Sequence, residues 1–214
     1  MDSHIAFLIL AFTSLLAIVN PLSAVPIYLA MTTSYERVHR AATLRRAILT
    51  AFLVMSVFTL LGNAILGFFG ITTPAFQIAG GIIFFGIGWD MLQARRSRVK
   101  TTEEEVTEGA GKEDIGIIPL GLPTLAGPGA ITTVIALGSQ AGDPVEKAIV
   151  YVAIVLVLGV CWLVLAAAPT VVARLGRTGL NVLTRIMGLL VTVIGVQFVI
   201  NGVSTIVLGL GGRL

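Results

Sequence analysis

The sequence has few charged residues and no segments in which polar and apolar residues alternate. Aspartate, glutamate, lysine and arginine make up only 12% of its 214 residues, whereas 56% are hydrophobic and the mean hydropathy is +0.99. A soluble domain needs about a quarter of its residues charged, so the composition excludes that class. The lack of strand-like alternation argues against an outer-membrane barrel. We therefore expect a helical integral membrane protein.

Residues for catalysis and metal binding are also scarce. The single cysteine, Cys161, lies in an apolar run, which predicts a small core residue without a disulfide. His4 and His39 lie near the ends of apolar runs, without metal-ligating neighbours in the sequence. Because there is also no nucleophile–base pair and no phosphate-binding loop, we expect no enzyme activity, no cofactor and no metal. The pI of 9.4 reflects basic loops of a membrane protein, so no nucleic acid partner is expected.

Six apolar segments are long enough to cross a bilayer. They cover residues 5–31, 42–69, 74–93, 116–138, 146–172 and 184–209. Most of the 24 glycines lie inside them, where glycine lets helix backbones approach closely. The predicted fold is an all-α membrane protein with six transmembrane helices. Since the N-terminus lacks the basic region of a signal peptide, we interpret the first segment as an uncleaved helix.

Lysine and arginine are concentrated in alternate loops. All of them except Lys147 and Arg213 lie in the first, third and fifth loops. The positive-inside rule then makes these loops cytoplasmic and places both termini outside. We expect a multi-pass protein of the cytoplasmic (inner) membrane, surrounded by the lipid bilayer.

The first and fourth segments are interrupted by proline. Asn20-Pro21 and Pro26 interrupt the first, and Gly127-Pro128 interrupts the fourth. Proline removes a backbone donor and clashes with the preceding turn, so each helix must bend or break. In hydrocarbon, the freed backbone groups are tolerated only where protein or a polar cavity satisfies them. Each break therefore packs against a partner helix or lines a site.

Glycines in the third and sixth segments keep the same sequence interval as the two breaks. Gly81 aligns with Gly188, and Gly88 aligns with Gly195, at the offset that relates Asn20 to Gly127. Three spans per half make the second half cross the membrane in the opposite sense. This predicts an inverted 3+3 repeat in which helices 1 and 4 are equivalent and broken near the midplane. The predicted division is a first repeat over 1–93, a cytoplasmic linker over 94–115 and a second repeat over 116–214.

Paired broken helices in inverted halves indicate a transporter's binding site at the midplane. Helix N-termini suit a carboxylate, and helix C-termini and free carbonyls suit an ammonium group, so two facing breaks fit a zwitterion. The predicted substrate-binding residues are Asn20, Pro21, Ser23, Pro26, Gly127, Pro128, Gly129, Thr132 and Thr133. The alternative, in which they only cap helix ends and bond between helices, stays open.

Two polar residues are candidates for ion coupling. Asp90 is the acidic residue well inside an apolar run, and an intramembrane carboxylate indicates proton or cation coupling. It lies shortly before Arg95 and Arg96, so it can instead reach the cytoplasmic interface and pair there. Gln197 is its equivalent in the second half. It either contributes to the substrate site or only forms hydrogen bonds between helices.

Three segments carry a resemblance to a known family. IVNPLSAVPIYLAMT, GLPTLAGPGAITTVIAL and the closing RIMGLLVTVIGVQFVINGV resemble the MarC family of bacterial and archaeal integral membrane proteins. The resemblance implies a six-span inner-membrane protein of a family described as transporting small neutral amino acids. A more distant similarity to the lysine-exporter superfamily implies that the direction can be export. From the resemblance to the MarC family, only the two motifs Asn20-Pro21 and Gly127-Pro128-Gly129 are taken as the expected binding site.

The leading hypothesis is a secondary transporter for alanine-, glycine- or serine-like amino acids. The absence of an ATP-binding motif leaves an ion gradient, with protons favoured, or the substrate's own gradient as the energy source. The alternative is a channel or facilitator for a small neutral solute. The exact substrate, the direction, the coupling ion and association into a homo-oligomer stay open.

Overall fold

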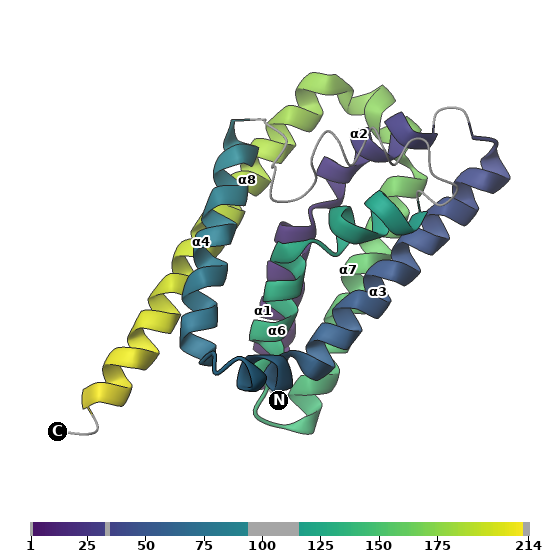
Figure 1. Ribbon diagram of the computed structural model, residues 1–214. Helices are drawn as coiled ribbons and strands as arrows, with labels where there is room; N and C mark the ends of the chain where they lie inside the picture. The colour runs from purple at the N-terminus through teal and green to yellow at the C-terminus, as the bar shows by residue number, and fades with distance from the viewer. Residues whose placement is uncertain (1, 33–34, 94–115, 212–214) are drawn as a thin grey trace.

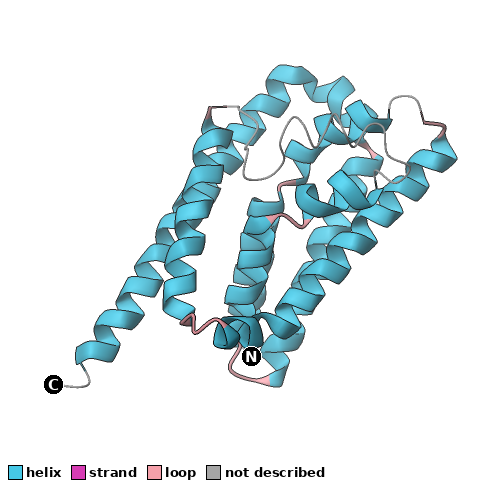
Figure 2. Ribbon diagram, viewed as in Figure 1, coloured by secondary structure: helices cyan, strands magenta, loops and turns pink. Residues whose placement is uncertain are grey.

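The computed structural model describes residues 2–32, 35–93 and 116–211, and over these residues it contains helices and no strands (Figure 2). The elements are α1 (Asp2–Val19), α2 (Pro21–Thr32), α3 (Arg37–Phe68), α4 (Thr73–Leu92), η1 (Gly116–Leu125), α6 (Pro128–Gln140), α7 (Pro144–Ala166) and α8 (Ala168–Gly211). The expected all-α class is confirmed. The predicted linker over 94–115 lies outside the described residues.

Five helical stretches are long and apolar enough to cross a membrane, and a sixth is present if η1 and α6 count as one bent span. The five are Ser3–Leu29, Arg37–Phe68, Thr73–Leu92, Pro144–Ala166 and Thr178–Leu208. The axes of η1 and α6 differ by 59°. The chain is therefore a multi-pass membrane protein with five to six apolar helices. The start of α1 and the end of α8 lie at the same end of the molecule (Figure 1).

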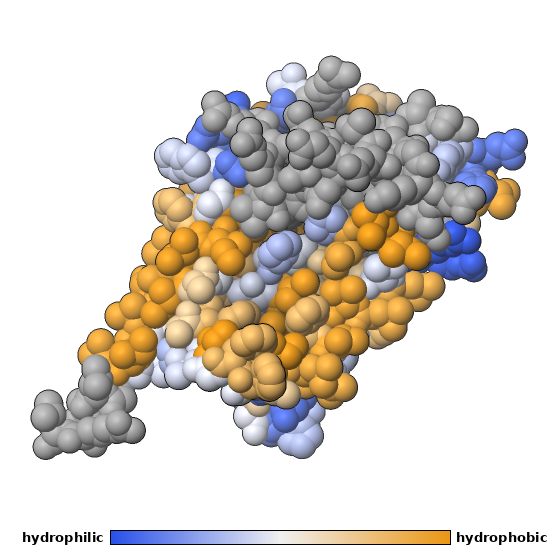
Figure 3. Space-filling view, viewed as in Figure 1, coloured by the Kyte–Doolittle hydropathy of each residue, from blue (hydrophilic) through white to orange (hydrophobic). Residues whose placement is uncertain are grey.

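Large apolar side chains stay exposed on the outward faces of the helices. Leu60 of α3, Leu163 of α7 and Val193 of α8 are examples, each more than half exposed. They contribute to the hydrophobic band between the more polar ends of the molecule in Figure 3. In water such a surface would aggregate. In a bilayer it is the surface that faces the lipid chains.

The segment before the last span differs from the prediction. Residues 173–183 were expected to form the fifth loop, but α8 runs through them as helix and bends at Gly176. Gly176 has φ 61° and ψ −179°, a backbone conformation that glycine adopts without steric cost. The bend replaces the expected loop, because one glycine is enough to change the direction of the chain.

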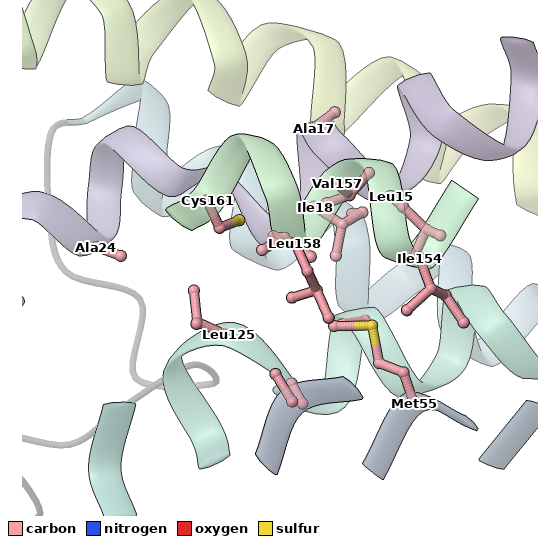
Figure 4. Packing of buried hydrophobic residues seen from close by; sticks show 14 of the residues in the cluster. Leu15, Ala17, Ile18, Ala24, Met55, Leu125, Ile154, Val157, Leu158 and Cys161 are labelled. Carbon is pink, nitrogen blue, oxygen red and sulfur yellow. The ribbon is translucent and has the colours of Figure 1, made fainter. Parts of the chain in front are cut away.

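The buried core lies where α1, α7, α3 and η1 meet. Figure 4 shows Leu15 and Ile18 of α1, Ile154 and Leu158 of α7, Met55 of α3 and Leu125 of η1 in one cluster. Cys161 of α7 belongs to it and is fully buried, as expected for a small core residue. The core surrounds the inner ends of α1 and η1 and holds them in place.

Helices α4 and α8 pack side by side through glycine (Figure 1). A Cβ atom on Gly81 would lie 2.5 Å from the carbonyl oxygen of Gly195, and one on Gly88 would lie 2.8 Å from that of Gly188. Such distances leave no room for a side chain, so the two backbones are in direct contact. The four glycines that align in the sequence are therefore those that face each other in space.

Candidate functional site

The first interruption consists of Asn20 alone, between α1 and α2. Its φ of 46° lies in the left-handed region, which asparagine adopts more readily than most residues. Because Pro21 follows, Asn20 is disfavoured in the helical conformation and the chain turns before α2 begins. The carbonyl oxygen of Asn20 accepts hydrogen bonds from the backbone N–H of Ser23 at 3.1 Å and from its hydroxyl at 2.8 Å. Ser23 therefore ties the first turn of α2 back to Asn20.

The side chain of Asn20 is buried with an unused donor. The residue is 1% exposed, and its amide nitrogen Nδ2 has no hydrogen-bond partner among the described residues. A buried polar group without a partner costs about 1–3 kcal/mol. Buried polar atoms nearly always have a partner, so an orphaned amide calls for a ligand or a water molecule as its acceptor.

The second interruption lies between η1 and α6. Gly127 is extended, with φ −77° and ψ 176°, and a Cβ atom there would lie 2.5 Å from the carbonyl oxygen of Pro123. Only glycine fits so close to the preceding backbone. Pro128 then starts α6 at a position where its missing N–H is not needed. The next amides, those of the buried residues Gly129 and Ala130, lie in the first turn, where a helix offers them no acceptor.

Gly129 brings the start of α6 into contact with the end of α1. A Cβ atom on Gly129 would lie 3.0 Å from Cγ2 of Ile18 and 3.2 Å from Cδ1 of Ile87 in α4. Ile18 shortly precedes Asn20, and Gly129 shortly follows Gly127. The two interruptions therefore lie beside each other in the interior, where the upper ends of α1 and α6 meet in Figure 1.

The predicted substrate-binding residues differ in burial. Asn20, Pro21, Gly127, Gly129, Thr132 and Thr133 are buried, Ser23 is part-buried, and Pro26 and Pro128 are exposed. Pro26 and Pro128 therefore differ from the buried residues in their exposure, which does not by itself exclude them from a site. Assignment of all nine to a substrate stays a prediction.

The two threonines use their hydroxyl groups within α6. Thr132 donates to the carbonyl oxygen of Pro128, and Thr133 donates to that of Gly129, both at 2.8 Å. The methyl group of Thr132 packs closely against Gly80 of α4. These contacts favour the alternative role, in which threonine bonds to its own helix and fills space between helices.

The coupling candidates lie on α4 and α8. Asp90 is in the last turn of α4 and is partly exposed. Gln197 is exposed on α8, and its amide donates to Oδ1 of Asn201 at 2.8 Å. Arg95 and Arg96, the expected partners of Asp90, lie outside the described residues, so that pairing stays a prediction.

Comparison with known proteins establishes the family. The family model described as "MarC family integral membrane protein" matches residues 5–207, nearly the whole chain. The chain belongs to the MarC family. The resemblance seen in the sequence motifs is thereby confirmed. No solved structure matches the chain.

Curated MarC relatives match over most of their length. The UPF0056 membrane protein MJ1677 of Methanocaldococcus jannaschii is 39% identical, over 92% of this chain and 96% of that protein. UPF0056 membrane protein YhcE of Escherichia coli is 37% identical over 93% of each chain, and UPF0056 membrane protein YvbG of Bacillus subtilis is 35% identical over 93% and 95%. Their names describe membrane proteins and state no reaction or substrate.

The structure of this MarC protein also joins residues that the sequence left unconnected. His4 Nε2 in α1 lies 3.3 Å from Oδ2 of Asp143, which is 139 residues away. Glu146 in the first turn of α7 lies beside them, with one ligand atom of each residue within 4.8 Å of the others. His4 therefore has two carboxylates close to it in space, although it has no such neighbours in the sequence. Only the packing of α1 against α7 reveals them.

Proposed function

We propose that this MarC protein is a secondary transporter that carries small neutral amino acids, such as alanine, glycine or serine, across the cytoplasmic membrane. The carrying observation is the buried amide of Asn20, which has no partner among the described residues at the point where the start of α6 contacts the end of α1. This amide can donate a hydrogen bond to a ligand that supplies an acceptor.

The chemistry of the two interruptions favours a zwitterion. Helices α2 and α6 begin there, and a helix N-terminus, with its partial positive charge and N–H groups that lack intrahelical acceptors, suits a carboxylate. Nδ2 of Asn20 adds a donor to the same group. Helices α1 and η1 end there, and their last carbonyl oxygens suit an ammonium group. No charged side chain whose exposure the structure describes is buried, so a ligand with net charge would lack a counter-charge.

The close packing favours a small substrate. Gly127 and Gly129 have backbone or side-chain neighbours within about 3 Å of the position of a Cβ atom. We therefore expect a ligand that contacts both interruptions to have a short side chain. This supports alanine, glycine or serine over larger amino acids.

Helix packing supports the inverted repeat that an alternating-access mechanism needs. The contact of α1 with α7 has a counterpart in that of η1 with α3. The contacts of α2 with α7 and α8 likewise correspond to those of α6 with α3 and α4. The glycine contact between Gly81 and Gly195 changes into that between Gly188 and Gly88 when the halves are exchanged. We infer that the halves rock around the interruptions and expose the site to each side in turn.

Orientation and energy source complete the proposal. The arginines at the start of α3 lie at the end of the molecule opposite the first residues of α1, which supports a cytoplasmic position for that end (Figure 1). The gradient of an ion, with protons favoured, or of the substrate itself drives transport. Asp90 is the proton-coupling candidate from the sequence, but its partial exposure in the last turn of α4 favours the interfacial role.

Flux into proteoliposomes tests the proposal. Purified wild-type protein is expected to take up labelled alanine with saturation and to show counterflow when unlabelled alanine is loaded inside. The matched variant is Asn20→Gly, because glycine keeps φ at 46° without strain and removes only the amide. We expect it to lose at least nine-tenths of the flux while keeping its thermal stability.

Two outcomes would reject parts of the proposal. Linear flux without counterflow would identify a channel or facilitator. Wild-type uptake by the Asn20→Gly variant would show that Asn20 serves only to turn the chain.

A further inference from the structure

A cluster of metal-ligating side chains lies at the outer end of the molecule, away from the two interruptions. His4 is in the first turns of α1, Asp143 directly precedes α7, and Glu146 is in the first turn of α7. Helices α1 and α7 pack along each other and bring these ends together (Figure 1). The three residues are part-buried, with side-chain exposures of 38% for His4 and 45% for Asp143, so an ion from solvent can reach them.

The spacing fits a tetrahedral ion. Ligand atoms about 2.0–2.2 Å from a tetrahedral zinc ion lie roughly 3.3–3.6 Å from one another. His4 Nε2 and Asp143 Oδ2 are 3.3 Å apart, which is one edge of such a tetrahedron. A ligand atom of Glu146 lies within 4.8 Å of both and would have to move closer to complete three corners. The part-buried position of the three residues leaves the fourth corner for a water molecule.

Backbone hydrogen bonds hold both carboxylates in place. Oδ1 of Asp143 accepts from the N–H of Glu146 at 2.7 Å, and Oε2 of Glu146 accepts from the N–H of Gly142 at 2.8 Å. Each bond uses one oxygen and orients the other, as supporting contacts do in metal sites. The hydrogen bond from the Glu146 N–H is also the main cause that holds the pKa of Asp143 below its ordinary value, with His4 adding to it.

The surrounding charges permit a cation. The N-terminus of α7 carries a partial positive charge, but two full carboxylate charges outweigh it. Lys147 is next in sequence to Glu146 and is the nearest basic residue along the chain. It lines a separate cavity of about 110 Å³ with Thr59, Asn63 and Tyr151.

We infer that His4, Asp143 and Glu146 form a binding site for a first-row divalent transition metal of the Zn²⁺ class. The site joins the start of α1 to the start of α7. One imidazole and two carboxylates suit zinc, cobalt or nickel, whereas Mg²⁺ and Ca²⁺ prefer oxygen ligands alone. A bound ion would fix the outer half of α1, and this inference does not depend on the proposed transport.

Calorimetry with ZnCl₂ on the detergent-purified full chain, with any affinity tag removed, tests the site. We expect about one Zn²⁺ per chain. His4→Ala removes a ligand, and Glu146→Gln removes a charged ligand but keeps an oxygen that can accept from Gly142. Since loss of a supporting residue alone costs 10–100-fold in metal affinity, each variant is expected to bind at least tenfold more weakly.

His39→Ala is the matched control, because His39 is the other histidine, is exposed and stacks edge-to-face on Tyr35. It should bind Zn²⁺ like the wild type. Co²⁺ should give visible absorption of a tetrahedral complex that His4→Ala abolishes, and Mg²⁺ should not compete. Thermal unfolding without metal checks that the variants are folded. Absence of binding by the wild type, wild-type affinity in either ligand variant, or equal weakening by His39→Ala would overturn the site.

Discussion

Glycine allows close helix packing at two places in this protein: backbone lies against backbone between α4 and α8, whereas at the start of α6 the backbone lies against side chains of α1 and α4. Between α4 and α8, Gly81 and Gly88 contact Gly195 and Gly188 within unbroken helices. Between α1 and α6, Gly129 contacts Ile18 where both spans are interrupted. Glycine provides the close approach in both.

The two contacts differ in the number of polar groups that they leave without a hydrogen-bond partner. Backbone groups within a continuous helix bond to each other, so the α4–α8 contact leaves no backbone donor or acceptor for a polar ligand. Helix ends leave N–H and carbonyl groups unpaired, and Asn20 adds a buried amide without a partner among the described residues. We therefore infer that glycine at the α4–α8 contact serves stability, whereas glycine at the interruptions serves the site.

The largest expected effect is on folding, from Gly88→Leu. A Cβ atom there would collide with Thr192 and lie 2.8 Å from the carbonyl oxygen of Gly188, so the helices must separate. Overpacking costs about 1–3 kcal/mol where side chains can adjust, and more where backbone must move. We expect little folded protein by size-exclusion chromatography and a thermal midpoint at least 5 °C lower, on the order of 1 kcal/mol or more.

Gly86→Ala is the control for that variant. Gly86 is in the same helix, and nothing lies within 4 Å of the position of its Cβ atom. Its thermal midpoint should equal or slightly exceed that of the wild type, because alanine favours helix. Equal stability of Gly88→Leu and Gly86→Ala would disprove the close α4–α8 contact.

The next effect is on transport, from Gly129→Leu. Its Cβ atom alone would lie 3.0–3.6 Å from Ile18, Ile87 and Phe84, so the larger leucine side chain would displace these neighbours at the start of α6. We expect alanine counterflow to fall at least tenfold, with a smaller loss of stability than in Gly88→Leu. Gly159→Ala in α7, where the Cβ position is open, should transport normally. Wild-type counterflow by Gly129→Leu would remove Gly129 from the site.

A smaller effect is expected from Thr133→Val. The hydroxyl of Thr133 is fully buried and donates to the carbonyl oxygen of Gly129, within its own helix. Valine has nearly the same shape, so uptake should stay within about threefold of the wild type and the fold should persist. A loss of uptake comparable to that of Asn20→Gly would instead place the hydroxyl on the substrate.

The smallest effect is expected from Asp90→Asn. Asp90 lies in the last turn of α4 and is partly exposed, unlike the buried residues of the interruptions. Uptake by proteoliposomes with an imposed proton gradient should change by less than twofold. If the variant transports alanine but no longer responds to the gradient, Asp90 couples protons and the interfacial interpretation is wrong.

Local chemistry explains what the sequence could predict. Asn20-Pro21 and Gly127-Pro128 mark helix ends because proline limits the conformation of its own and of the preceding residue, whatever the surroundings. Gly81 and Gly88 indicated close packing, since glycine inside a membrane helix is common at helix contacts. These features need no knowledge of the partner.

Features that depend on the partner could not be predicted. The bend at Gly176 depends on a single residue with positive φ. The amino-acid composition of this segment does not tell such a bend from a loop. His4 and Asp143 meet only because α1 packs against α7, and their separation in sequence hides the contact. The orphaned amide of Asn20 likewise depends on which groups surround it. Its burial could be known only from the fold.

Equilibrium binding of alanine to the detergent-purified protein tests the central claim, that the interruptions form the substrate site, most directly. Hydrogen bonds to a charged group contribute about 1.5–3 kcal/mol, so Asn20→Gly should bind alanine at least tenfold more weakly than the wild type. Its thermal midpoint without ligand should be unchanged. Equal alanine affinity in the two proteins would contradict the account.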